Sequence, residues 1–192
     1  MFKRGFKSWC ETVSASLRSE LGLQPMDPMD PFKLAAHLDV VVWRFDEIPD
    51  LSADAIATLR ADSDSWSAAT VCVGIRSAVI LNSRHSGRRM NSDLTHELSH
   101  IVLAHTPARV DVSADGLLLL STYDRAQEDE ANWLAGCLLV PREPLVVARR
   151  QKLSAEEIAT RFGASTDMVT YRINVTGVDE QIRRTRRKIP QN

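Results

Sequence analysis

Hydrophobic and polar positions along the chain predict helices first, then strands, then helices again. The pattern predicts one helix over residues 5–21, which ends at Gly22. A second helix follows over residues 32–38, where Asp30 can cap the helix and Pro31 can occupy its first position. Apolar runs rich in β-branched residues then predict three strands, over residues 40–45, 69–73 and 78–81, with a hairpin around 74–77.

Helical periodicity returns in the second half of the chain, where helices are expected over residues 91–105, 126–139, 154–162 and 165–174. Pro141 ends the apolar helix 126–139. A short helix is expected near 53–60, and residues 106–124 are polar and irregular. This order predicts an α+β fold, with a small, mainly antiparallel sheet packed on helices, and not a βαβ repeat.

The last two expected helices resemble a helix-turn-helix. Ser154 and Glu157 have capping-box spacing, Gly163 ends the first helix and Ser165 can cap the second. We therefore divide the chain into a main domain (1–150), a helix-turn-helix-like segment (151–180) and a basic tail (181–192). The residues that such a segment would turn toward DNA or a protein substrate are Ser165, Thr166, Thr170 and Arg172.

The net charge of −1 combines an acidic body with a basic end. Five basic residues lie in the last ten positions, so residues 1–180, with 19 basic and 25 acidic residues, carry about −6. Nucleic-acid binding is therefore expected only near the C-terminal end. No apolar run approaches the roughly 20 residues of a membrane span, and the basic start lacks the apolar core of a signal peptide. Three cysteines without a CxxC pattern favour a reducing cytoplasm.

The most informative motif is His96-Glu97-Leu98-Ser99-His100. Positions i and i+4 share a helix face, so the two imidazoles can bind one metal ion. Glu97 is then the general base that acts on a water molecule, and zinc suits nitrogen and oxygen donors in tetrahedral geometry. The apolar residues that follow the motif predict a helix packed on the core. By the helix wheel, His105 faces away from both histidines and is not expected to be a ligand.

A catalytic zinc site needs a third protein ligand, and the next helix supplies candidates. Glu128 and Asn132 lie four residues apart on one face, so we assign Glu128 as the ligand and Asn132 as the amide that orients a ligand histidine. Glu130, on another face, is the second choice. Tyr123 is the candidate for stabilising the oxyanion.

These two motifs together resemble the ImmA/IrrE family of metallopeptidases. Thr95-His-Glu-Leu-Ser-His100 matches the family's active-site helix, and Glu128-x-Glu-Ala-Asn132, continuing through Leu138-Leu-Val-Pro141, matches its second motif. The similarity covers roughly residues 30–175. Ser99 stands where the family commonly has glycine, and no ligand or base is missing.

The resemblance implies a zincin-like, cytosolic endopeptidase with one zinc ion. Members of the family typically cleave a helix-turn-helix repressor, which relieves repression, so a repressor or antitoxin-like protein is the expected substrate and no membrane partner is expected. The alternative is a DNA-binding transcriptional regulator or metal-sensing protein that uses the C-terminal helix-turn-helix and has little or no peptidase activity. We favour the peptidase.

Overall fold

The structure is a computed structural model of the 192-residue chain. It describes residues 2–48, 54, 57, 60, 66–73, 76–106, 110–112, 118–120 and 124–187. The short helix expected near 53–60 lies largely outside the described residues, and Tyr123 lies outside them altogether.

Two helices open the chain, and their ends follow the expected caps. Helix α1 spans Phe6–Glu20 and helix α2 spans Pro31–His37. The backbone N–H of Phe32 donates to Asp30 Oδ1 at 2.9 Å, and Pro31 occupies the first turn of α2, where no backbone N–H is required. Both predicted helices are confirmed.

A three-stranded sheet follows in the order β1-β3-β2. It consists of β1 (Val41–Arg44), β2 (Ala68–Val73) and β3 (Arg76–Leu81), with a 3-10 turn, η1 (Phe45–Glu47), after β1. The expected antiparallel pairing of β2 with β3 is confirmed, whereas β1 pairs with β3 in parallel. Two short antiparallel strands, β4 (Val110–Val112) and β5 (Leu118–Leu120), occupy part of the region expected to be irregular.

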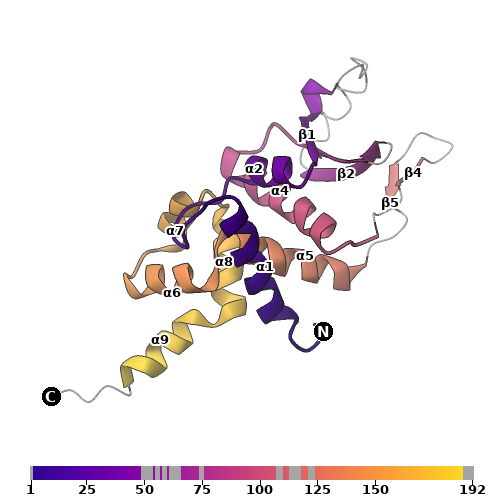
Figure 1. The fold of residues 1–192 in the computed structure, drawn as a ribbon. Coiled ribbons are helices and arrows are strands. Elements are labelled where there is room, and N and C mark those ends of the chain that lie inside the picture. The colour runs from indigo at the N-terminus through magenta and orange to yellow at the C-terminus, as the bar shows by residue number, and fades with distance from the viewer. Residues whose placement is uncertain are drawn as a thin grey trace.

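One face of the sheet lies on helix α4 (Gly87–Val102), and α4 in turn lies on helix α5 (Arg125–Leu139), as Figure 1 shows. Helix α4 begins four residues earlier than expected because Ser86 caps it, its hydroxyl accepting from the N–H of Arg89 at 3.3 Å. Leu94 and Leu98 on α4 are fully buried. The sheet therefore holds α4 in place from one side and α5 holds it from the other.

The C-terminal part consists of α6 (Arg142–Arg150), α7 (Ala155–Phe162), α8 (Thr166–Thr176) and α9 (Val178–Arg187). The expected capping box of α7, the left-handed Gly163 (φ 66°) and the Ser165 cap of α8 are all present. Helices α6 and α9 were not expected from the sequence. Residues 181–187 belong to α9, so the predicted basic tail begins within a helix.

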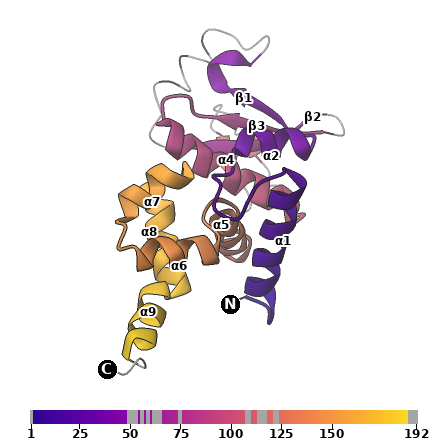
Figure 2. The same cartoon turned by 60° about the vertical axis from the view of Figure 1, so that its left-hand side comes forward.

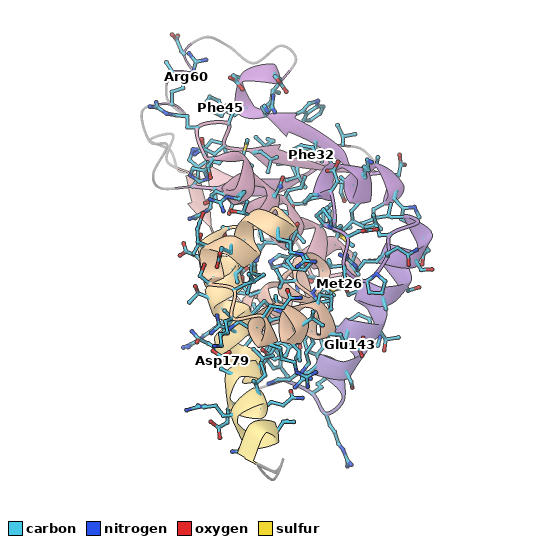
Figure 3. The ribbon with its side chains drawn as sticks, turned by 90° about the vertical axis from the view of Figure 1, so that its left-hand side faces the viewer. Met26, Phe32, Phe45, Arg60, Glu143 and Asp179 are labelled. Carbon is cyan, nitrogen blue, oxygen red and sulfur yellow. The ribbon has the colours of Figure 1, made fainter. Side chains whose placement is uncertain are left out.

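Two apolar clusters form the core, and α5 contributes to both. The first joins α1, α2, β3, α4 and the middle of α5, and the second joins the end of α5 to α6 through α9. The domain division at residue 150 therefore stays a prediction. Figure 3 shows Phe45, near the sheet, and Asp179, on α9, far apart in the molecule. Within the C-terminal part, Arg149 of α6 pairs with Asp179 through two contacts of 2.8 and 2.9 Å.

The carboxyl end of α5 leaves backbone carbonyls without partners in the helix, as every helix does. Side chains from both ends of the chain bind them. The Ser14 hydroxyl donates to the carbonyl of Cys137 at 2.7 Å, and Arg18 Nη1 donates to that of Leu138 at 3.0 Å. Arg172 Nε, from α8, donates to the carbonyl of Val140 at 3.1 Å. Figure 2 shows α1 and α8 on opposite sides of α5.

The described part of the chain is thus a mixed α+β fold with a small sheet packed on helices, which confirms the predicted fold class. Among the described residues, no helix is long and apolar enough to cross a membrane.

Candidate metal centre

Helix α4 carries the two predicted histidine ligands on one face. His96 and His100 lie one turn apart, and their Nε2 atoms are 3.1 Å from each other. The opposite face of α4 is anchored in the core by Leu94 and Leu98. Because the helix is fixed on its apolar side, both imidazoles are presented together on its polar side.

Helix α5 brings the predicted third ligand to the same point. Asp124 caps α5 by accepting from the N–H of Ala126 at 2.8 Å, so Glu128 falls in the first turn, four residues before Asn132. Glu128 Oε2 lies 3.1 Å from His96 Nε2, and its Oε1 lies 3.5 Å from His100 Nε2.

The remaining nitrogen of each histidine has a partner of its own. His96 Nδ1 lies 3.1 Å from Asn132 Oδ1, as expected for an amide that orients a ligand. His100 Nδ1 lies 3.0 Å from Nδ1 of His105. Since each Nδ1 faces another residue, both Nε2 lone pairs are directed at the space that Glu128 also faces.

This donor set fits a metal ion. One ligand atom from each of His96, His100 and Glu128 lies within 4.8 Å of the other two. Among the residues that the structure describes, this is the group of three arranged to hold an ion. Two imidazoles and a carboxylate are a common ligand set for catalytic zinc, which leaves a fourth position for water or substrate.

The charges of the three side chains are strongly coupled. Burial opposes protonation of His96, but its contacts with Glu128, the nearby charge of Glu97 and the contact with Asn132 outweigh burial and raise its pKa. Burial, and then the neighbouring charge of His96, lower the pKa of His100 to about 4. The hydrogen bond from His96 lowers the pKa of Glu128. Of the two histidines, His96 is therefore the one that takes up a proton more readily, and Glu128 is the carboxylate that accepts a hydrogen bond from it.

Glu97 lies beside this cluster and belongs to a different set of contacts. Its Oε2 accepts a hydrogen bond from the hydroxyl of Thr70, on strand β2, at 2.5 Å. Burial raises the pKa of Glu97 despite that hydrogen bond and the neighbouring His96. A carboxylate with a raised pKa next to a metal site suits a general base.

His105 and Glu130 lie next to the candidate metal ligand His100. The sequence did not predict this position for either residue. The group of side chains that could hold an ion does not include His105, in line with the helix-wheel argument, but His105 lies beyond the end of α4, where the wheel does not apply. Its ring contacts His100, and its Nε2 lies 3.3 Å from Oε2 of Glu130. Glu130 thus reaches the site through His105, and the ligand group contains Glu128 in its place.

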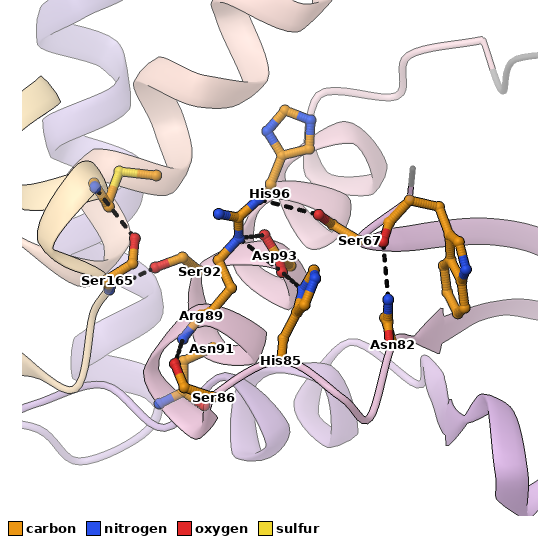
Figure 4. A network of polar contacts seen from close by, with 12 residues as sticks. Ser67, Asn82, His85, Ser86, Arg89, Asn91, Ser92, Asp93, His96 and Ser165 are labelled. Atoms are coloured by element: carbon orange, nitrogen blue, oxygen red, sulfur yellow. Dashed lines mark hydrogen bonds and ion pairs between the residues drawn. The ribbon is translucent and has the colours of Figure 1, made fainter. Parts of the chain in front are cut away.

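The amino-terminal half of α4 is tied to its neighbours by polar contacts, shown in Figure 4. Asp93 lies 3.0 Å from His85 and 3.1 Å from Arg89, and Arg89 donates to the Ser67 hydroxyl just before β2. The N–H of Ser165 donates to the Ser92 hydroxyl at 2.9 Å. These contacts fix α4 against the sheet edge and against the turn between α7 and α8.

The four residues of the helix-turn-helix-like segment that were expected to contact DNA or substrate lie in different surroundings. Arg172 is fully buried, with Nη2 paired to Glu11 at 2.7 Å, so the prediction that Arg172 contacts DNA or substrate is wrong. Thr166 donates to Glu156, and Ser165 caps α8 and packs on α4. Thr170 is exposed, and its role stays a prediction.

A helix pair that carries two histidines and a carboxylate, beside a half-buried glutamate and a small sheet, defines a zincin-like metallopeptidase fold. Comparison with known families agrees, because the Peptidase_M78 family, described as the IrrE N-terminal-like domain, matches residues 48–174. That match covers more than half of the chain, which belongs to the ImmA/IrrE family of metallopeptidases. A search of curated proteins gave no match.

Proposed function

We propose that this protein is a zinc-dependent endopeptidase that cuts a protein partner in the cytoplasm. The observation that carries the proposal is the convergence of His96, His100 and Glu128 next to Glu97. Family membership supports a metallopeptidase. The free thiols of Cys10 and Cys137 are consistent with a reducing compartment.

In this proposal, His96 Nε2, His100 Nε2 and a Glu128 oxygen hold one zinc ion. Bound zinc would polarise the scissile carbonyl and lower the pKa of water to roughly 7. Glu97 accepts the proton of the attacking water on Oε1, because Oε2 is already occupied by the hydroxyl of Thr70. As the water oxygen bonds to the carbonyl carbon and the C–N bond breaks, Glu97 passes that proton to the leaving amine.

For the substrate we propose a helix-turn-helix repressor or antitoxin-like protein, the class that members of this family typically cut. The proposal is tested by incubating the zinc-loaded protein with such a repressor encoded beside it, and by following fragments by gel and mass spectrometry. Glu97→Gln should retain zinc and lose cleavage, while His96→Ala/His100→Ala should lose both. Cleavage by Glu97→Gln at the wild-type rate would refute the role of Glu97.

The structure offers little support for the alternative, a DNA-binding regulator or metal sensor. Arg172 is buried, and Ser165 and Thr166 are engaged within the chain. The exposed Arg183 and Arg184 of α9 both pair with Glu180. A salt-dependent gel shift with operator DNA that is unchanged in Glu97→Gln, without any cleavage, would favour the regulator over the peptidase.

A further inference from the structure

His105 is placed by the way helix α4 ends. The N–H of His105 donates to the carbonyl of His100 at 3.0 Å, and the N–H of Ala104 donates to that of Ile101, also at 3.0 Å. Together these bonds form a Schellman motif, with Ala104 in the left-handed position that glycine usually occupies (φ 51°). The chain therefore doubles back, and the ring of His105 packs on the ring of His100, with 4.9 Å between centroids.

The contacts of His105 use both of its ring nitrogens. Nδ1 lies 3.0 Å from His100 Nδ1, and Nε2 lies 3.3 Å from Glu130 Oε2. The side chain of His105 is only 7% exposed and that of Glu130 is 25% exposed. With both nitrogens engaged, His105 has no lone pair left for an ion, which agrees with its absence from the ligand group.

If His100 binds a metal ion, its role as a ligand determines which ring nitrogen carries the proton in both His100 and His105. A metal on His100 Nε2 requires the ring proton on Nδ1, which must then be donated to a lone pair. His105 Nδ1 provides that lone pair, so the proton of the neutral His105 ring lies on Nε2 and is donated to the Glu130 carboxylate. Every donor in the series faces one acceptor, and the series ends on a carboxylate, as do many histidine ligands of metal sites.

We infer that His105 and Glu130 are positioning residues that hold His100 in the tautomer and orientation that bind zinc. They do for His100 what Asn132 does for His96, although Asn132 acts directly and Glu130 acts through His105. The inference rests on the proposed zinc site and extends it to two residues that touch neither metal nor substrate.

The test is the zinc dissociation constant, measured by competition with a chromophoric chelator in the absence of substrate. His105→Phe keeps a ring but removes the acceptor, and it should weaken zinc binding about 10–100-fold. His105→Asn keeps an acceptor near the position of Nδ1 and should recover most of that loss. Melting temperatures of the metal-free variants show that each one folds, and His37→Phe, an exposed histidine paired with Glu20, should leave zinc binding unchanged.

Glu130→Gln should weaken zinc binding by a smaller factor, because a neutral amide oxygen still accepts from His105. Asp129→Asn removes the same charge from the exposed neighbouring position and should have no effect. In the double variant His105→Phe/Glu130→Gln, the loss should equal that of His105→Phe alone, since Glu130 acts through His105.

Zinc binding by His105→Phe within about two-fold of wild type would overturn the inference, as would equal losses in His105→Phe and His105→Asn. Additive losses in the double variant would show that Glu130 does not act through His105. Loss of zinc in Glu130→Gln as complete as in Glu128→Gln would make Glu130 a ligand and also overturn the inference. Because no substrate is involved, these results are independent of whether the protein proves to be a peptidase.

Discussion

Thr70, on the edge strand β2, donates its hydroxyl proton to Oε2 of Glu97 across 2.5 Å. The contact joins the sheet to the carboxylate that we propose as the general base, and no described residue forms a hydrogen bond with Oε1 of Glu97. A hydrogen bond that aims a general base contributes to the transition state without binding substrate, so its loss should lower kcat more than it changes KM.

Thr70→Val keeps the shape of the side chain and removes the hydroxyl. We expect kcat to fall about ten-fold, the equivalent of one hydrogen bond of roughly 1.4 kcal/mol, with zinc content unchanged. Thr70→Ser should recover most of the rate. Thr12→Val, on the exposed side of α1, is the matched control. Equal kcat values for Thr70→Val and wild type would show that Thr70 does not aim Glu97.

The half-buried Glu97 should lower the stability of the metal-free protein. Burial raises its folded-state pKa, so stability falls as the pH rises from its ordinary pKa through its folded-state pKa, and the cost is larger at pH 7.5 than at pH 5. Glu97→Gln should therefore stabilise the metal-free protein by roughly 1 kcal/mol at pH 7.5, and by less at pH 5. Urea unfolding at both pH values measures the difference. Glu143→Gln, at an exposed position, should give no such gain, and a destabilised Glu97→Gln would contradict the argument.

Zinc binding should release one proton near pH 6, and this proton should come from His96. The pKa of His96 is raised above 6.5, that of His100 lies at about 4, and that of Glu128 is lowered, so only His96 among the three ligands is protonated there. Zinc affinity should consequently fall about ten-fold for each pH unit below the pKa of His96.

Calorimetry of zinc binding in buffers of different ionisation enthalpy counts the released protons. Using the Glu97→Gln variant excludes any contribution from the neighbouring carboxyl, whose pKa is also raised. Release of two protons at pH 6 would show that His100 is protonated as well, contrary to its low pKa.

Gly136 lies against the aliphatic part of the buried Arg172. A Cβ at position 136 would come within 2.3 Å of Arg172 Cδ. Gly136→Ala should therefore displace the Arg172 guanidinium from Glu11 and from the carbonyl of Val140, and should destabilise the protein by about 2–4 kcal/mol. Gly87→Ala, in the first turn of α4 with open space around the new methyl, is the matched control and should be close to neutral. Thermal unfolding of both variants checks the prediction, which an unchanged melting temperature in Gly136→Ala would refute.

Local signals in the sequence identified most elements correctly. Asp30, Ser154 and Ser165 cap the helices that they were expected to cap, because capping depends on residues three or fewer positions away. The i, i+4 spacing of His96 and His100, and of Glu128 and Asn132, likewise follows from helix geometry alone. Bringing these pairs together required the two helices to pack, which the family resemblance implied.

The features that the sequence did not predict depend on contacts or backbone turns that no local pattern signals. Arg172 looks like a surface residue in sequence, but it is fully buried, and its guanidinium pairs with Glu11, which lies 161 positions away. His105 was missed because the turn that folds it back onto His100 has Ala104 in the left-handed position, so the usual glycine signal is absent. The parallel pairing of β1 with β3 also leaves no trace in either strand's own pattern.

Helix α5 carries Glu128 and Asn132 at one end, while Ser14, Arg18 and Arg172 hold its other end. The fifteen residues of α5 thus connect the candidate metal centre with the contacts that α1 and α8 make at its other end. Bulky fusions near Phe6, or trimming of α8, would accordingly appear in the laboratory as poor zinc retention, even though every ligand is intact. Expression designs for this protein should keep both of these helices whole and add affinity tags beyond them on flexible spacers.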